Sequence, residues 1–307
     1  MSDILGGPKE LLMSDQSASS PMLAFSTALA GLVRAAAPSL VSVQSKRARS
    51  TGFSWRPGLI VAAENALPDE EEVSIVAHGG ASSPAEIVGR DPSSDVALLR
   101  VARTDLAKAP ASAGAPAAGA LAIVAGAREG APSASLGVVS FVGPQWRSLR
   151  GGVIDARIEL DAALTRSSEG GLALDAEGRA LGMAVFGPRR RTLVIPMATI
   201  DRVAELLSTK GRIARGYLGL GLQAVKLDGG GVGAMAISVD AKGPGAAAGV
   251  RQGDIIEAWN GEPIRGVHHL VRALGPDSVG ASVRLTLRRA GEPVEATLTI
   301  GERPESR

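Results

Sequence analysis

The sequence predicts a mainly β protein of two globular units, and three observations support this. Short apolar runs recur from Leu40 to about Ala184, separated by Gly, Pro, Asp and Ser, which is typical of an all-β barrel or sandwich. A helical pattern follows at residues 198–211, and a second series of strands begins at Arg215. The 307 residues suffice for two domains, each with its own core.

The first unit is expected to begin with a helix, because Leu23, Phe25, Leu29, Leu32 and Val33 recur at helical spacing before Pro38. Strands are then expected at residues 40–45, 58–63, 72–78, 85–90, 96–101, 121–126, 135–143, 152–160, 179–187 and 192–197. We expect Thr199 to cap the start of the helix at 198–211 and Gly211 to end it.

The second unit is expected to contain strands within residues 216–225, 233–240 and 253–264, a helix at 267–275 and a hairpin at 282–300. Asn260-Gly261 suits a tight hairpin turn. The basic connector "TKGRIARG" marks the boundary. The predicted organisation is therefore a polar flexible leader at 1–21, a first domain at 22–210 and a second domain at 211–305.

Composition excludes several classes of function. The chain has no cysteine, so disulfides, thiolate metal sites and a cysteine nucleophile are excluded. Its net charge is +2 without a long basic run, so we expect no nucleic-acid partner. For Arg189, Arg190 and Arg191, solvent exposure is favoured over pairing with Glu169 or with an acidic partner. The apolar stretch 22–40 contains Arg34 and is too short to predict a membrane span. Residues 1–21 lack a basic segment followed by an apolar run, which favours a cytoplasmic location over a periplasmic one.

Several motifs, in this order, resemble those of the HtrA/Deg family. They are "APSLVSV", "LIVAAENALP", "VGRDPSSDVALLRV", "LDAALTRSSEGGLALDAEGRALGM", "RGYLGLGLQ" and "GPGAAAGVRQGDIIEAWNGEPI". The similarity covers roughly residues 30–303. The resemblance implies a trypsin-like double six-stranded β-barrel followed by a PDZ domain, a β-sandwich with helices.

The resemblance also assigns a catalytic triad of Ser, His and Asp, of which one member is present. Asp95 falls on the orienting carboxylate, Asn65 on the histidine and Glu169 on the serine nucleophile. Ser167 and Ser168 fall in the loop that forms the oxyanion hole. Asparagine cannot act as a base near neutral pH, and an ionised Glu169 would repel a developing oxyanion. The resemblance therefore implies a catalytically inactive pseudoprotease.

Two observations test this interpretation against others. His78 is the single histidine of the first domain and is expected at a hairpin tip, away from Asp95. A divergent serine endopeptidase for protein quality control would need Ser167 or Ser168 as nucleophile and an unconventional base. A cluster of Glu169, Asp95 and Asp161 could bind a metal, but a solvated or arginine-paired Glu169 is favoured. We therefore expect no metal and no cofactor.

The PDZ-like region retains what peptide recognition requires. Such domains add a peptide strand to a sheet edge and hold its terminal carboxylate with backbone N–H groups. By resemblance, the contacts come from a loop and strand and from the start of a helix: Tyr217, Leu218, Gly219, Leu220, Gly221, Leu222, His268 and His269. If a histidine faces the ligand, binding should change between about pH 6 and 7. Expected partners are a protein or peptide with a free C-terminus, and, by resemblance, a homotrimer or an active homologue.

Overall fold

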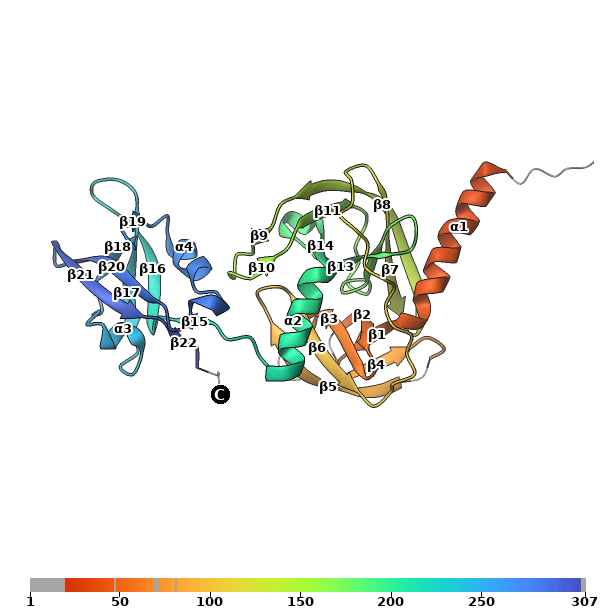
Figure 1. Ribbon diagram of the computed structural model, residues 1–307, viewed down its shortest axis with the longest axis horizontal. Coiled ribbons are helices and arrows are strands. Elements are labelled where there is room, and N and C mark those ends of the chain that lie inside the picture. The colour runs from red at the N-terminus through yellow and green to blue at the C-terminus, as the bar shows by residue number, and fades with distance from the viewer. Residues whose placement is uncertain (1–19, 47, 69–71, 81, 305–307) are drawn as a thin grey trace, which may run out of the picture.

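The computed structural model describes residues 20–304 except 47, 69–71 and 81. Most of the predicted leader, residues 1–19, lies outside these described residues. Figure 1 shows a double β-barrel at the centre, a smaller β unit beside it and a helix, α1, that extends from the opposite side. The predicted mainly β fold, with two closed six-stranded barrels followed by a PDZ domain, is confirmed.

The first barrel is an antiparallel sheet closed in the order β1-β2-β3-β6-β5-β4. Its strands are β1 (Leu40–Gln44), β2 (Arg49–Arg56), β3 (Leu59–Ala63), β4 (Val73–Ala77), β5 (Ser82–Asp91) and β6 (Val96–Val101). Its interior is filled with Val, Ile, Leu and Ala, including Val41, Ile60, Ile75 and Leu99. A strand at β2 was not among the sequence predictions, because its residues "RSTGFSWR" carry the Ser, Thr and Gly typical of turns.

The second barrel closes in the order β11-β14-β13-β12-β7-β8. Its strands are β7 (Leu121–Arg128), β8 (Ala131–Gly143), β11 (Arg157–Asp161), β12 (Leu172–Leu174), β13 (Ala180–Phe186) and β14 (Thr192–Pro196). A short hairpin of β9 (Trp146–Arg147) and β10 (Val153–Ile154) lies between β8 and β11. The segment predicted as one strand at 152–160 is therefore two strands, β10 and β11.

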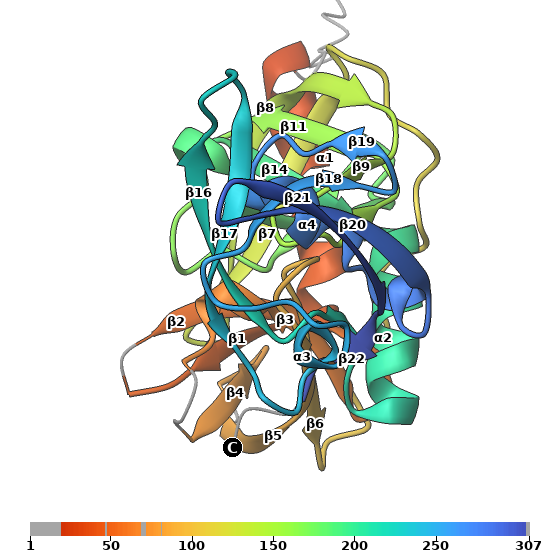
Figure 2. The same ribbon diagram turned by 90° about the vertical axis from the view of Figure 1, so that its left-hand side faces the viewer.

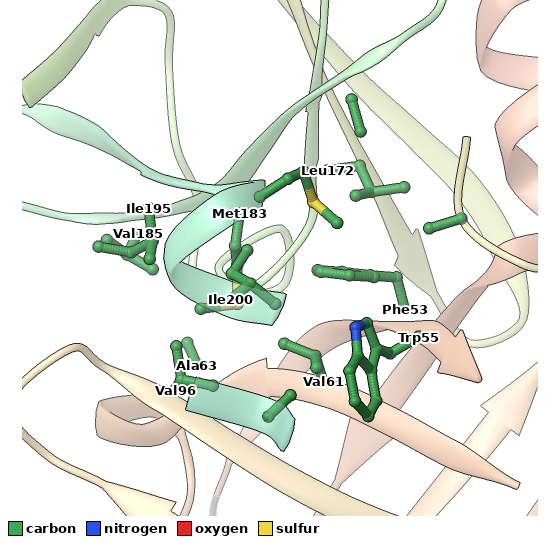
Figure 3. Packing of buried hydrophobic residues seen from close by; sticks show 14 of the residues in the cluster. Phe53, Trp55, Val61, Ala63, Val96, Leu172, Met183, Val185, Ile195 and Ile200 are labelled. Atoms are coloured by element: carbon green, nitrogen blue, oxygen red, sulfur yellow. The ribbon is translucent and has the colours of Figure 1, made fainter. Parts of the chain in front are cut away.

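The largest apolar cluster joins the two barrels. Phe53, Val61 and Val96 come from the first barrel, whereas Leu172 and Met183 come from the second. Figure 3 shows these side chains facing one another beneath the helix that carries Ile200. Phe53, Leu172 and Met183 have no exposed surface, so this core fixes the two barrels against each other. The loops at the end of the junction are thereby held in place.

Two helices cover the double barrel. Helix α2 (Met197–Lys210) buries Ile200, Val203 and Leu207, and Gly211 ends it in the left-handed conformation at φ 70°, as predicted. Thr199 does not cap its start: it lies in the first turn, where its hydroxyl donates to Asp155 Oδ2 over 2.6 Å. That acceptor lies on the barrel, so tertiary contact replaces the expected cap.

Helix α1 (Pro21–Ala36) packs only its C-terminal half on the core, through Leu29, Leu32 and Val33. Met22, Leu23 and Phe25 are exposed. The segment Pro21–Ser39 has 19 residues and meets the length and apolarity of a membrane span, contrary to the sequence analysis. Signal sequences near an N-terminus meet the same criterion, so this is weak support for a membrane span.

The PDZ unit is built on a sheet with the order β16-β17-β18-β20-β21, and β19 pairs with β18. The strands are β15 (Gly216–Tyr217), β16 (Leu220–Lys226), β17 (Val232–Val239), β18 (Ile255–Trp259), β19 (Glu262–Pro263), β20 (Ser282–Arg289), β21 (Glu292–Thr299) and β22 (Gly301–Glu302). Helices α3 (Pro244–Ala247) and α4 (Val267–Ala273) complete it, and Figure 2 shows the unit in front of the barrels. Asn260 and Gly261 both have positive φ in the β18–β19 turn, as the tight hairpin requires.

Candidate functional site

The three triad positions lie together at the junction of the barrels. Strand β3 pairs with β6 so that Ala63 faces Val96, which places Asn65, just after β3, beside Asp95, just before β6. Glu169 lies in the turn before β12, and its carbonyl accepts a hydrogen bond from the Thr51 N–H of β2 over 2.8 Å. Three segments distant in sequence therefore meet at one place, as the resemblance implied.

Asp95 is buried, with 9% of its surface exposed, and has no cation as hydrogen-bond partner among the described residues. The Asn65 N–H donates to Asp95 Oδ1 over 2.8 Å, and the Asn65 side chain also hydrogen-bonds the carboxyl. Burial raises the pKa of Asp95 to about 7; the charges of Glu169 and Glu64 act in the same direction, and the bonds from Asn65 oppose them. Asp95 also has φ 60°, which is rare for a residue with a Cβ.

Glu169 is also buried, with 9% of its surface exposed. Burial raises its pKa, whereas a hydrogen bond from the Phe186 backbone and the charge of Arg166 lower it. The Glu169 side chain is buried rather than solvated; no ion pair to it occurs in the described part of the chain, although the charge of Arg166 acts on it. Asp161 lies exposed on β11, outside the site, so the proposed three-carboxylate cluster does not form.

The turn that carries Glu169 uses its own backbone donors internally. The Ser168 and Glu169 N–H groups both donate to the Thr165 carbonyl, over 3.1 and 3.0 Å. Ser168 Oγ is buried and accepts from the Thr165 N–H over 3.0 Å. Ser167 is more exposed than Ser168, and its Oγ lies 3.0 Å from Thr165 Oγ1. The Glu169 N–H is therefore already hydrogen-bonded and is not free to bind an oxyanion.

A hollow of about 770 Å³ opens over these residues, and we call it the barrel cleft. Its lining includes Ser42, Ala48, Arg49, Asn65, Ala66, Arg128, Glu129, Thr165, Arg166, Ser167, Glu169, Phe186 and Arg190. None of the three histidines of the sequence lines it. His78 lies instead beside α1, in a hollow shared with Leu29 and Val33. No imidazole is therefore placed to activate Ser167.

The arginine-rich loop between β13 and β14 has specific contacts. Arg191 Nη1 lies 2.8 Å from Glu159 Oε2, and Arg157 pairs with the same carboxylate. Arg190 stacks over the Phe186 ring, 5.3 Å from its centroid. From the sequence, solvent exposure of Arg189, Arg190 and Arg191 is favoured over pairing with Glu169 or an acidic partner. Arg49, Arg128 and Arg166 are not among the predicted site residues. No local pattern reveals those three, because they come from three separate segments.

A second hollow, of about 740 Å³, lies between the PDZ unit and the barrels, which contribute Arg90, Asp91, Pro92, Ser93 and Arg150 to its lining. We call it the peptide groove because Tyr217, Leu218, Leu220 and Leu222, which the resemblance assigned to peptide binding, line it. Leu218, Leu220 and Leu222 line one side. The other side is formed by apolar residues of α4 and its C-terminal end: Val267, Leu270, Val271 and Leu274. Strand β16 is the edge of its sheet, so its outer hydrogen-bonding side faces no other strand of that sheet.

The loop before β16 has the geometry of a tight backbone site. Gly219 has φ 70°, and a Cβ there would lie 2.8 Å from the Gly243 Cα, so only glycine fits. Among the described residues, the N–H groups of Leu218 and Gly219 make no backbone hydrogen bond. The Tyr217 hydroxyl donates to Asp240 Oδ2 over 3.1 Å, which ties the loop to the end of β17.

The two histidines of α4 lie elsewhere. His268 and His269 line a third hollow with Leu149, Glu262 and Arg272, not the peptide groove. The apolar stripe of α4 faces the groove and turns the histidines away from it. Spacing could have revealed this, because Val267, Leu270, Val271 and Leu274 recur at i, i+3, i+4 and i+7.

Comparisons with known proteins agree with this architecture. Residues 50–183 match the family model of a trypsin-like peptidase domain, and residues 216–300 match that of a PDZ domain. A "Probable periplasmic serine endoprotease DegP-like" of Brucella suis is 28% identical over 278 residues, covering 85% of this chain and 54% of that protein. One of the same name from Bartonella henselae is 30% identical over 275 residues, covering 82% and 53%. The chain thus spans about half the length of the curated relatives it matches.

The crystal structure of the serine endoprotease from Yersinia pestis superimposes with a TM-score of 0.67 at 25% identity, covering 89% of this chain and 97% of that one. Fold and site together define a trypsin-like peptidase domain joined to a PDZ domain. More particularly, these matches support membership of the HtrA/DegP-like family.

Proposed function

We propose that this chain is a proteolytically inactive HtrA/DegP-like protein that recognises peptides and acts as a binding or regulatory scaffold. The observation that carries the proposal is the state of the Glu169 position. A buried carboxyl replaces the nucleophile, Asn65 replaces the base, and the Glu169 N–H is engaged by Thr165. Acyl transfer needs a hydroxyl nucleophile and a base, and neither is present at these two positions.

The direct test is reaction with a fluorophosphonate serine probe and turnover of casein. We expect neither labelling nor cleavage above a blank at pH 5 to 9. The variants Ser167→Ala and Ser168→Ala serve as controls, because any trace activity should be identical in both if it comes from a contaminant. Labelling of the unmodified chain that is lost in Ser167→Ala would refute the proposal and establish a divergent protease.

That divergent serine endopeptidase is the second candidate, and one observation favours it. The relatives from Brucella and Bartonella and the Yersinia protein are all named serine endoproteases. Ser167 is the hydroxyl that would have to act, because it lines the barrel cleft whereas Ser168 is buried. The curated relatives are also named periplasmic, so we propose a periplasmic rather than a cytoplasmic location. Export can be checked by fractionation of cells that express the full chain.

The binding part of the proposal rests on the peptide groove. Its apolar walls, its edge strand β16 and the N–H groups of Leu218 and Gly219 suit a peptide that adds a strand and ends in a free carboxylate. We carry over Tyr217, Leu218, Gly219, Leu220, Gly221 and Leu222 as contacts and leave out His268 and His269. Domain boundaries at 22–210 and 211–305, and assembly as a trimer or with an active homologue, belong to the same proposal.

A library of C-terminal peptides tests the groove. Free carboxylates should be enriched, and the selected peptide should lose at least about 100-fold in affinity when Leu222→Glu places a charge in the apolar groove, a loss of about 2.7 kcal/mol. The matched control is Gln223→Glu on the same strand, which is exposed and lies outside the groove lining. Equal binding of amidated peptides would contradict recognition of a C-terminus.

A further inference from the structure

The barrel cleft is lined by arginines from four separate segments. Arg49 lies at the start of β2, Arg128 at the end of β7, Arg166 in the turn before β12 and Arg190 in the short 3₁₀ turn after β13. All four side chains belong to exposed residues. The tertiary fold therefore gathers four arginines from separate segments of the chain around the Glu169 position.

Three of these arginines have no acidic partner in the part of the chain that the structure describes. Arg49 Nη1 is paired with Glu129 Oε1 over 2.5 Å. Arg128, Arg166 and Arg190 make no ion pair among the described residues, and Arg190 is held over the Phe186 ring. Glu169 is the other carboxyl in the lining and lies within the influence of the Arg166 charge, so four arginines face two carboxyls there. The barrel cleft is consequently cationic in a chain whose net charge is only +2.

The chemistry of the cleft favours carboxylates of a peptide over phosphates of a nucleic acid. Guanidinium groups pair with carboxylates through two parallel hydrogen bonds. Grooves that bind single-stranded nucleic acids combine basic side chains with several aromatic platforms for the bases. The lining here has one aromatic ring, Phe186, and Arg190 already covers it. The hydroxyls of Thr165 and Ser167 add hydrogen-bonding groups suited to a peptide backbone.

The size of the barrel cleft also suits a peptide segment. Its volume of about 770 Å³ lies within the usual range of about 300–1,000 Å³ for ligand sites. We propose that the barrel cleft binds an acidic segment of a partner protein, whose Asp and Glu carboxylates pair with Arg128, Arg166 and Arg190. The inference rests on the proposed function in one respect, namely that the bound segment is held without being cut.

The test uses a fluorescein-labelled acidic decapeptide of Glu, Asp and Gly with an amidated C-terminus, so that the carboxylate site of the PDZ unit cannot contribute. Fluorescence anisotropy with the full chain should show saturable binding that weakens as salt rises. The triple variant Arg128→Gln, Arg166→Gln, Arg190→Gln should weaken it by roughly tenfold or more, as three charge pairs are lost. Glu169→Gln should leave it equal or stronger, because a carboxyl is removed from the cleft.

The matched control is Arg34→Gln, Arg100→Gln, Arg251→Gln, which removes three exposed arginines away from the barrel cleft. This variant changes the net charge by as much as the cleft variant does, and its affinity for the acidic peptide should stay within about twofold of that of the unmodified chain. Equal loss in both triple variants would overturn the cleft assignment in favour of nonspecific charge. Tighter binding of an oligonucleotide than of the peptide would overturn the acidic peptide as ligand. Mass spectrometry of the peptide separates the two proposals, since cleavage would refute inactivity while binding would stand.

Discussion

Two buried aspartates, one in each domain, have opposite surroundings. Asp95, at the junction of the barrels, is 9% exposed and is hydrogen-bonded by Asn65, and no arginine or lysine among the described residues pairs with it. Asp254 in the PDZ unit is 1% exposed and accepts from Arg289 Nε and Nη2 over 2.8 and 2.7 Å. Burial raises the pKa of Asp95 to about 7, whereas hydrogen bonds from Arg289 lower the pKa of Asp254.

The difference separates a carboxylate that stabilises its domain from one that does not. The negative charge of ionised Asp254 is compensated by the neighbouring Arg289 guanidinium. The Arg251 N–H also donates to the carboxylate over 2.8 Å. Ionised Asp95 faces desolvation and the charges of Glu169 and Glu64. Buried carboxyls in such surroundings are typical of functional sites. The barrel cleft thus retains the electrostatics of a site, whereas the PDZ unit has those of a framework.

The largest expected effect is on the pH dependence of barrel stability. The folded pKa of Asp95 is raised from 3.8 to about 7, so the folded state holds this proton more tightly and stability falls as pH rises from about 4 to 7. Asp95→Asn should remove this slope and stabilise the barrel at pH 8 by up to about 4 kcal/mol. Urea unfolding at pH 5 and pH 8 measures it.

The control for that experiment is Asp161→Asn, an exposed aspartate of the same barrel. It should keep the slope of the unmodified chain. A destabilisation by Asp95→Asn at pH 8 would mean that the ionised carboxylate supports the fold, and the contrast between the two aspartates would disappear.

A smaller effect of opposite sign is expected in the PDZ unit. Asp254→Asn removes the charge that Arg289 pairs with, and should destabilise this unit by about 2–3 kcal/mol at pH 7. The lowered folded pKa of Asp254 means that its stabilisation is present at neutral pH and is lost as pH falls through the folded value. Calorimetry should therefore show that the variant's PDZ unit melts at a lower temperature than that of the unmodified chain at pH 7. At strongly acid pH the two melting temperatures should be nearly equal, and that of the barrels should not change.

The smallest effect concerns the connection between the domains. Arg215 Nη2 lies 2.7 Å from Asp91 Oδ1 at the end of β5, and its Nη1 donates to the Arg150 carbonyl over 2.7 Å. Arg215→Gln should separate the two thermal transitions further, by about 1 kcal/mol, because Asp91 still accepts bonds from Ser93 and Ser94. An unchanged separation of the two transitions would show that this contact does not couple the domains.

Much of the fold could be predicted from the sequence, because barrel strands and turns alternate locally and the motifs appear in family order. Strand β2 could not, since its buried polar residues Ser50, Thr51 and Ser54 lie where strands of both barrels meet. Their burial depends on partners distant in the chain, such as the Ser167 carbonyl, 116 residues away, to which Thr51 Oγ1 donates over 2.7 Å. The local sequence pattern does not indicate such long-range contacts.

The candidate site could likewise be predicted only in part from the sequence. Asn65, Asp95 and Glu169 could be placed by motif, because each lies within a recognisable segment. Arg190 lies on the 189–191 loop, for which pairing with Glu169 was already an alternative. Arg49 and Arg128 could not be placed at the site, because the closure of the barrels brings their strand ends to the cleft. The burial of Glu169 was likewise hidden, since its shielding depends on the strand ends at Thr51 and Phe186 that surround the turn.

The hydrogen bond from the Glu169 N–H to the Thr165 carbonyl has an evolutionary consequence. On the proposed function, a lineage that regained His at 65 and Ser at 169 would still possess a turn whose amide points its hydrogen at its own backbone. Each reversion alone would confer no measurable turnover, so selection would have nothing to act on until the loop reopened as well. On that proposal, restoring peptide cleavage would require a change of the turn's backbone as well as of the two side chains.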